Sequence, residues 1–382
     1  MEPFKNLIHS GLVSRMAAHL QRAWPALDAP RFEALAGAGL HRLELKARAM
    51  QVADALQATL PRDFERAAQV IETALAPLQT DACPAGGDPC RDGLEGWVLW
   101  PVGEFVARAG LAHPRRGLQV LHALTQRFTA EFAIRPFIVT HPQLTFATLQ
   151  RWTADPSEQV RRLVSEGSRP RLPWGQRMQA LVLDPAPTLP LLRALQDDPS
   201  ACVRRSVANH LNDIAKDHPG LVAQWLAEHL PDAPPARRAL LRHASRTLIK
   251  AGDPAVLKAW GLGQALRGEA TLKLQPRRVE LGGAVKLELH LVSTSPRAQM
   301  LAIDYAVHHR KANGSTGAKV FKGWQLHLPP RGKLLLTKTH SLRPVTTRRY
   351  HAGRHELEVQ VNGRVVARGH FMLRMQKEPH DG

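Results

Sequence analysis

Charged and amide side chains recur at a four-residue spacing in two segments of the chain, a spacing that puts them on one face of a helix. Arg162 and Glu166 form the first set, and Arg205, Asn209 and Asp213 form the second. Carboxylates held on neighbouring helices could stabilise a developing positive charge or hold a water molecule for attack. The alternative is ordinary ion pairing on a solvated face, which contributes only about a few tenths of a kcal/mol. Glu166 lies in the last turn of its expected helix, where the helix dipole disfavours an anion, and this argues against pairing alone.

These residues lie in two copies of one sequence repeat. Residues 155–166 and 198–209 both open with Asp-Pro-Ser and both contain Val-Arg-Arg at the same offset, 43 residues apart. A period of about 40–47 residues is typical of HEAT-type solenoids, in which paired helices stack and share one continuous core. Stacked in this register, the two helices would place an arginine row beside a row of acids and amide.

Each copy also contains signals for the start of a helix. We expect Asp155 and Asp198 to be the N-cap residues, each followed by proline at the first helical position. In the first copy Glu158 would complete a capping box with Asp155. The sequence therefore predicts that both helices begin directly after these aspartates.

A third acid, Glu131, lies upstream of the repeat. His113-Pro114 is expected to open a helix that runs to Phe132, which places Glu131 in its last turn. Arg127 lies four residues before Glu131, so an ion pair within this helix is the structural alternative to a functional role. Helical patterns extend from the start of the chain to about residue 265.

The pattern changes after residue 265. Short segments with alternating apolar residues follow one another, and Asn362-Gly363 between two of them is a strong signal for a two-residue hairpin. Six to eight strands in about 110 residues suggest an antiparallel sandwich of immunoglobulin-like architecture, here without any cysteine. We therefore expect a multidomain chain, α then β: an all-α HEAT-like repeat solenoid over residues 1–266, followed by an immunoglobulin-like β-sandwich over residues 270–376.

The charge of the chain points to a polyanionic partner. Formal net charge is +19 and the sequence pI is about 10.8. Residues 269–382 carry 20 Lys/Arg against 8 Asp/Glu, so the strand region holds +12 of this charge on less than a third of the length. We expect phosphate contacts from this region, whereas the alternative is a basic surface that serves solubility alone. Its central basic residues are Lys319, Lys322, Arg331, Lys333, Lys338, Arg343, Arg348 and Arg349.

Other features narrow the class of protein. Three cysteines favour free thiols in a reducing cytosol, and the first 20 residues lack the apolar core of a signal peptide. No run approaches the ~18–20 apolar residues of a membrane span, so we expect a cytoplasmic protein without a membrane partner. Metal binding is not expected, because the histidines lack ligand spacing and fit core or capping roles better. These histidines are His113, His141, His210 and His218.

Three long blocks carry a resemblance to a known family. They span residues 127–136, 160–174 and 203–219, and Glu-Pro-Phe-Lys-Asn at residues 2–6 accompanies them. Together they resemble the AlkC branch of the HEAT-repeat DNA alkylation-repair glycosylases, over roughly residues 1–265. Some members of that branch carry an immunoglobulin-like domain after the helices, and residues 270–376 look like one.

The resemblance implies a DNA glycosylase that hydrolyses the N-glycosidic bond of N3-methylated bases in duplex DNA, chiefly 3-methyladenine and also 3-methylcytosine. It implies that the lesion is not fully extruded, that no cofactor is needed and that the protein acts as a monomer. The acids that match the family pattern are Glu131, Glu166 and Asp213, with Arg162 as an active-site arginine and Trp174 placed to touch the lesion or the bent duplex. We expect Glu166 and Asp213 to lie closest to the chemistry, with Glu131 binding the lesion or positioning water.

Further residues are expected to contact DNA. Arginines on the helical face would grip phosphates and hold register without reading sequence. The alternative to an enzyme is a non-catalytic HEAT-repeat scaffold, in which the acids point apart or pair fully with Arg127, Arg162 and Arg205. An RNA-binding module ranks last, because it needs stacking aromatics on the strand domain and few are available. The additional DNA-contact candidates are Arg161, Arg169, Arg171, Arg204, Arg205 and Asn209.

Overall fold

Helices make up the first part of the chain and strands the last part, as the sequence predicts. The computed structural model describes residues 4–78, 92–345 and 348–375. It divides into two compact units, one formed by residues 1–217 and 234–244 and the other by residues 218–233 and 245–382. This division does not test the predicted boundaries at residues 266 and 270, which stay a prediction.

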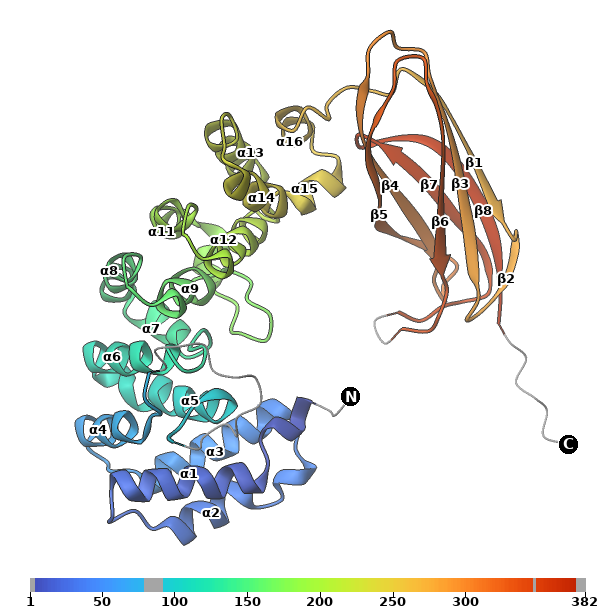
Figure 1. The fold of residues 1–382 in the computed structure, drawn as a ribbon. Coiled ribbons are helices and arrows are strands. Elements are labelled where there is room, and N and C mark those ends of the chain that lie inside the picture. The colour runs from blue at the N-terminus through green and yellow to red at the C-terminus, as the bar shows by residue number, and fades with distance from the viewer. Residues whose placement is uncertain (1–3, 79–91, 346–347, 376–382) are drawn as a thin grey trace, which may run out of the picture. The chain divides into compact units, whose positions relative to one another are not determined.

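The first unit is a stack of helices (Figure 1). Its α-helices are α1 Ser10–Ala23, α2 Ala29–Gly37, α3 Leu45–Thr59, α4 Phe64–Ala74, α5 Leu99–Ala109, α6 Pro114–Thr125, α7 Ile134–Thr140, α8 Pro142–Trp152, α9 Glu158–Gly167, α10 Gln179–Leu183, α11 Leu189–Leu195, α12 Ala201–Ile214 and α14 Pro235–Ala244. Short 3-10 helices lie at Phe4–Leu7, Leu40–Arg42, Gly96–Val98, Gly110–Ala112 and Ala186–Thr188.

The sequence repeat is a structural repeat of helix pairs. Helices α8 and α9 form one pair and α11 and α12 the next, with α8 packed on α11 and α9 on α12. In Figure 1, α4, α6, α8 and α11 follow one another along one side of the stack, and α9 and α12 lie on the other. Val160, Leu163 and Val203 are fully buried between the layers. The expected inward stripes therefore form the shared core of a HEAT-like solenoid.

The helix starts differ from the prediction by two residues. Helix α9 begins at Glu158 with Ser157 as N-cap, and α12 begins at Ala201 with Ser200 as N-cap. Asp155 Oδ1 instead accepts a hydrogen bond from the Ser157 amide at 2.9 Å, and the matching bond from Ser200 to Asp198 is 2.8 Å. The predicted N-caps and the capping box were wrong, because each aspartate closes a turn before its helix rather than capping the helix itself.

The expected helix from His113 to Phe132 is also shorter. Helix α6 ends at Thr125, and residues 126–133 form turns before α7 begins. Glu131 lies in these turns rather than in a last helical turn. Arg127 donates to the backbone carbonyls of Ala123, at 2.9 Å, and Ala76. The ion pair between Arg127 and Glu131, which was the structural alternative to a functional role for Glu131, is therefore not formed.

The second unit contains a two-sheet sandwich and three helices, α13 Pro219–His229, α15 Arg246–Ala251 and α16 Pro254–Ala259. One sheet has the order β1-β3-β6 and the other the order β2-β8-β7-β4-β5. The strands are β1 Gly268–Gln275, β2 Arg278–Glu280, β3 Ala284–Ser293, β4 Gln299–Arg310, β5 Thr316–Leu328, β6 Lys333–Ser341, β7 Gly353–Val361 and β8 Arg364–Arg374.

The sandwich core takes residues from both sheets. Leu287 and Leu289 on β3 are fully buried and pack in the same cluster as Val359 on β7 and Phe371 on β8. Between β7 and β8, Asn362 and Gly363 have φ angles of 49° and 75°, which is the left-handed pair that a type I′ turn requires. The predicted hairpin and the immunoglobulin-like sandwich are therefore confirmed. No helix in the described ranges is long and apolar enough to cross a membrane.

Candidate active site

Two of the three predicted acids share one arginine. Arg169 donates from Nη1 to Glu166 Oε1 at 2.5 Å and from Nε to Asp213 Oδ2 at 2.8 Å. The Glu166 and Arg169 side chains are each 9% exposed, and the Asp213 side chain is 2% exposed. Glu166 comes from α9 and Asp213 from α12, so the stacking of the two repeats brings these carboxylates together.

The remaining oxygen of each carboxylate also has a partner. Ser206 Oγ donates to Glu166 Oε2 at 2.6 Å, and Lys216 Nζ lies 2.8 Å from Asp213 Oδ1. Ser206 is buried on α12, whereas Glu166 is on α9, the helix that packs against α12. Both carboxylates are therefore held in fixed orientations, as charge-stabilising groups in an enzyme must be.

Glu131 is held differently, through one oxygen only. Its Oε2 accepts from Thr129 Oγ1 at 2.8 Å and from Arg162 Nη2 at 2.9 Å, and Arg162 Nη1 also donates to Thr129 at 3.1 Å. The Glu131 side chain is 13% exposed. Within the described part of the chain, no hydrogen bond reaches its Oε1. Glu131 thus has a carboxylate oxygen that a ligand could use.

Gly167 lets the turn that carries Glu131 approach α9 closely. A Cβ atom at this position would lie 3.9 Å from the Glu131 Cα and 2.5 Å from Ile134 Cγ2. Real Cβ atoms do not tolerate the shorter of these contacts, so a larger residue would separate the two segments. The glycine at the end of α9 therefore sets the distance between Glu131 and the arginine-bridged pair.

The charges of all three acids act on one buried guanidinium, that of Arg135. Burial, and then the charge of Arg169, lower the pKa of Arg135 to about 10, whereas Asp213, Glu131 and Glu166 act in the opposite direction. Arg135 is fully buried. Arg169 joins Glu166 and Asp213 directly, and the Glu131 backbone lies next to Gly167, the neighbour of Glu166.

Arg135 also fixes the loop that leads away from α9. It donates to the backbone carbonyls of Gly167 at 2.9 Å, Arg169 at 2.8 Å and Gln176 at 2.7 Å. Trp174 lies in this loop, with 68% of its surface exposed and a φ of 64°. A bulky side chain rarely adopts this backbone conformation. The loop therefore has an anchored base and holds an aromatic side chain out in solvent at the cost of strain.

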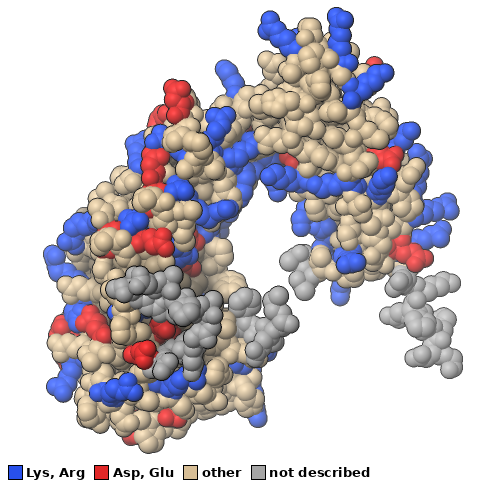
Figure 2. Space-filling model, viewed as in Figure 1, with Lys and Arg blue, Asp and Glu red and all other residues tan. Residues whose placement is uncertain are grey.

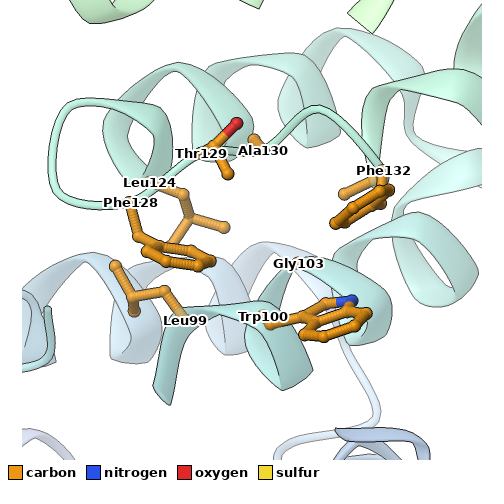
Figure 3. A pocket seen from close by; sticks show the side chains of 9 residues that line it. Leu99, Trp100, Gly103, Leu124, Phe128, Thr129, Ala130 and Phe132 are labelled. Carbon is orange, nitrogen blue, oxygen red and sulfur yellow. The ribbon is translucent and has the colours of Figure 1, made fainter. Parts of the chain in front are cut away.

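An aromatic wall borders the turn of Glu131 (Figure 3). Trp100 and Phe132 stack with centroids 5.2 Å apart, and Phe128 contacts Trp97 at the same centroid distance. The side chains in Figure 3 enclose a cavity of about 10 Å³, which also touches Thr129. This volume is about that of one water probe and far below the ~300 Å³ of a small-molecule pocket.

Comparisons with known proteins agree with this architecture. A family model described as "Uncharacterised protein YhaZ, C-terminal Ig-like domain" matches residues 269–375. The "Uncharacterized protein YhaZ" of Bacillus subtilis (strain 168) is 35% identical over 371 residues, which cover 96% of this chain and 98% of that protein. The solved structure of Pseudomonas fluorescens alkylpurine DNA glycosylase AlkC, bound to DNA containing an abasic site analog, is 34% identical with a TM-score of 0.88, and the match covers 98% of this chain and all of that one. The chain belongs to the AlkC family.

Two arginines of this AlkC-family chain, one in each repeat, donate hydrogen bonds to groups within the protein. Arg161 donates to Asp198 from Nε and Nη2 at 2.6 and 3.1 Å, and to the Asp155 carbonyl at 2.8 Å. Arg204, its counterpart one repeat later, donates to the Asp198 and Pro199 carbonyls. The expectation that these two arginines contact DNA stays a prediction, and their guanidinium groups are already used within the protein.

Arg205 and Arg171 are more accessible than Arg169, the predicted DNA contact that lies between Glu166 and Asp213. Arg205 is exposed and its Nη1 lies 3.4 Å from His243 Nδ1, whose Nε2 is 2.9 Å from Asn209 Oδ1. Arg171 pairs with Asp217 at 2.7 and 2.6 Å. The expected face of α12 is therefore split, because Asp213 points into the protein while Arg205 reaches solvent.

Sequence reasoning in this AlkC-family chain missed the residues that support the acids. Thr129, Arg135, Ser206 and Lys216 all contact the acids or their supporting arginine. All four lie within the blocks that carry the family resemblance, so their positions were a signal, although the sequence did not indicate their contacts. Among the described residues, no three His, Cys, Asp or Glu side chains are grouped so that they could hold a metal ion.

His210 is a buried residue of the same region of the AlkC-family chain. It is fully buried on α12, and its Nδ1 lies 2.9 Å from the Ser165 carbonyl. Burial lowers the pKa of His210 to about 4, so the imidazole is neutral near pH 7. These contacts fit the core role that the sequence favoured for this histidine.

The β-sandwich of the AlkC-family chain presents its basic residues on the surface. Figure 2 shows Lys and Arg side chains spread over this unit with few acids among them. Lys319, Arg331 and Lys333 are exposed. The aromatic residues that an RNA-binding surface would need are less available, because Lys338 lies over the Trp324 ring and Lys319 over that of Phe321. This arrangement favours backbone phosphate contacts over base stacking.

Proposed function

We propose that this chain is a DNA glycosylase that removes N3-alkylated bases, chiefly 3-methyladenine and also 3-methylcytosine, from duplex DNA by hydrolysis of the N-glycosidic bond. One observation supports this most: Arg169 joins Glu166 and Asp213, with Glu131 in the turn packed against the same helix end, in a chain that matches AlkC over 98% of its length. That relative is an alkylpurine DNA glycosylase bound to DNA containing an abasic site analog.

The chemistry of the lesion fits an acid cluster. An N3-alkylated purine already carries positive charge, so its glycosidic bond is weak and needs no strong general acid. The transition state resembles an oxocarbenium ion, as in sugar hydrolysis. Fixed carboxylates stabilise this charge more strongly in the transition state than in the ground state, and that difference accelerates the reaction.

The hydrogen bonds suggest different roles for the acids. Both oxygens of Glu166 and of Asp213 are engaged within the protein, which suits fixed negative charges. Glu131 binds its partners through Oε2 alone, so its Oε1 is the oxygen best placed to receive the lesion or the attacking water. We therefore place Glu131 nearest to the substrate, ahead of the two acids that the sequence favoured.

In this proposal the mechanism does not need full base extrusion, as the family resemblance implies. The cavity that touches Thr129 has a volume of about 10 Å³ and cannot contain a nucleobase. Glycosylases that flip the base instead enclose it in a shaped pocket. In this proposal the lesion stays in or near the duplex, and the exposed Trp174 and Arg205 contact DNA next to it.

The partner in this proposal is double-stranded DNA containing alkylated bases. The exposed basic residues of the β-sandwich would neutralise phosphates, which makes binding dependent on salt but not on sequence. Phosphate binding would account for the net positive charge per residue of the β-sandwich, which exceeds that of the helical part.

Release of free 3-methyladenine from alkylated duplex DNA tests the proposal. The native chain is compared with Glu131→Gln, Glu166→Gln and Asp213→Asn under conditions where all variants are folded. Glu72→Gln is the matched control, because Glu72 pairs with Arg116 away from the three acids. We expect release to fall by about 100-fold or more in the three site variants, with DNA binding retained and the control unaffected.

The alternative is a scaffold that binds DNA or protein without catalysis. This alternative predicts that the acids point apart or pair fully with Arg127, Arg162 and Arg205. Of those pairs, the one between Glu131 and Arg162 forms and leaves one oxygen of Glu131 without a partner in the described structure, whereas Glu166 and Asp213 pair with Arg169 instead. A native chain that binds alkylated duplex DNA tightly and releases no base would favour the scaffold.

A further inference from the structure

Arg169 is placed unlike an arginine that binds phosphate. The sequence suggested a DNA contact, yet its side chain is only 9% exposed and its guanidinium lies between two carboxylates. Phosphate-binding side chains need to reach the surface of the protein. The structure therefore requires another role for this residue.

The Arg169 guanidinium offsets the repulsion between Glu166 and Asp213, two buried carboxylates at close range. Arginine remains charged under all ordinary conditions and offers a rigid planar fork, so it can bind both carboxylates at once.

The backbone of Arg169 is itself held in place by hydrogen bonds. Arg135 donates to the Arg169 carbonyl and to the carbonyls of Gly167 and Gln176, which flank the loop. The Arg169 amide also donates to the Glu166 carbonyl at 3.3 Å. Its backbone is therefore held at the end of α9, and its side chain has one well-defined direction.

We infer that Arg169 is a positioning residue that fixes the orientation of Glu166 and Asp213 and offsets their mutual repulsion, and that Arg135 anchors it. This inference rests on the proposed function for its effect on base release, but its structural part can be tested without any activity. It assigns to Arg169 no contact with DNA.

The inference makes an unusual prediction about charge. If attraction of a cationic lesion were all that mattered, removing a positive charge from the site would accelerate base release. If Arg169 acts as a positioning residue, its removal slows release, because the two carboxylates lose the partner that fixes their orientation. The two models therefore predict changes of opposite sign from one substitution.

The test uses Arg169→Gln, Arg169→Lys and a matched control, Arg116→Gln. Arg116 also bridges two carboxylates, those of Glu65 and Glu72, but on the neighbouring helices α4 and α6. Release of 3-methyladenine is measured with protein in excess, so that the rate reports the bound complex. Binding to an uncleaved duplex is measured over a range of salt concentrations.

We expect Arg169→Gln to slow release from the bound complex by about 100-fold, because misplaced catalytic groups lose rates of this order. Arg169→Lys should recover part of the rate, since it keeps the charge but loses the fork. Affinity and its salt dependence should stay within about two-fold of native, and Arg116→Gln should match the native rate. Weakened binding with a salt slope reduced by about one, at an unchanged rate, would show a phosphate contact and overturn the inference. Faster release would overturn it as well.

A second measurement keeps the inference testable if the native chain releases no base. Urea unfolding is measured for Arg169→Gln, for Asp213→Asn and for the double variant. We expect strong coupling, because the second substitution removes a buried charge that the first leaves without its partner. Additive effects would show that the two side chains do not depend on each other and would overturn the positioning role. Absence of base release with strong coupling would refute the proposed function alone.

Discussion

Replacing Gly167 with alanine tests how the site is held together. Gly167 is the last residue of α9, and its φ is outside the left-handed region in which glycine is required. Backbone conformation therefore permits alanine here, and the effect of the substitution depends on packing. A Cβ atom would lie 2.5 Å from Ile134 Cγ2 and 3.3 Å from Leu163 Cδ1.

The size of the effect follows from these two contacts. Ile134 and Leu163 are both fully buried, so neither can move away without displacing its own neighbours. Overpacking of this kind typically costs about 1–3 kcal/mol. Alanine offsets up to about 1 kcal/mol of this cost, because it loses less backbone entropy than glycine when the helix folds. We expect Gly167→Ala to be destabilised by about 1–2 kcal/mol in net.

Activity should fall further than stability explains. Ile134 begins α7, directly after the turn that carries Glu131, so a shift of Ile134 moves Glu131 away from Arg162 and the bridged pair. A displacement near 1 Å can slow a reaction by about 100-fold. The assay combines urea unfolding, followed by circular dichroism, with release of 3-methyladenine at a temperature where the variant is folded.

Gly220→Ala is the control for this experiment. Gly220 lies in α13, where a new Cβ would have no neighbour within 4 Å. It should be as stable as the native chain or slightly more stable, with unchanged release. If Gly167→Ala behaves like Gly220→Ala, the argument that close packing at α9 positions Glu131 is wrong.

Three further predictions follow from other contacts. Trp174→Gly should raise the stability of the fold by about 1 kcal/mol, because it relieves a left-handed backbone, while it weakens binding to alkylated duplex; equal or lower stability would show that the conformation carries no strain. Asp198→Asn should lower stability by about 2–3 kcal/mol in urea unfolding, because Asp198 is buried and binds Arg161 through both oxygens, and release should fall only with the folded fraction. In the β-sandwich, burial and then the charge of Arg348 lower the pKa of His309 to about 3 and that of His340 to about 4. The unfolded chain binds these protons first, so stability should be full above about pH 6.5 and fall as the pH drops towards 4, and His309→Phe should reduce that fall in thermal unfolding.

The sequence was most informative where a physical pattern repeats. The 43-residue offset between α9 and α12 and the Asn362-Gly363 turn predicted the helical stack and the hairpin correctly. Helix starts were less predictable, because Asp155 and Ser157 both have side chains suited to capping and only the tertiary contacts decide between them. His122 Nε2 lies 2.7 Å from Asp155 Oδ2, and His122 belongs to α6, the third helix upstream of Asp155. No local pattern reports it.

The site shows the same limit for a different reason. Counting positive charges treats each arginine as available to a phosphate, yet Arg135, Arg161, Arg169 and Arg204 all donate to carbonyls or carboxylates within the repeats. A guanidinium has five donors, so one arginine can satisfy several backbone carbonyls at a loop or a helix start. Some of the arginines that the sequence suggests as DNA contacts are therefore already bonded within the repeats. The proposed DNA contacts consequently depend on the arginines and lysines whose side chains remain in solvent, such as Arg205 on α12 and Lys319 and Arg331 in the sandwich.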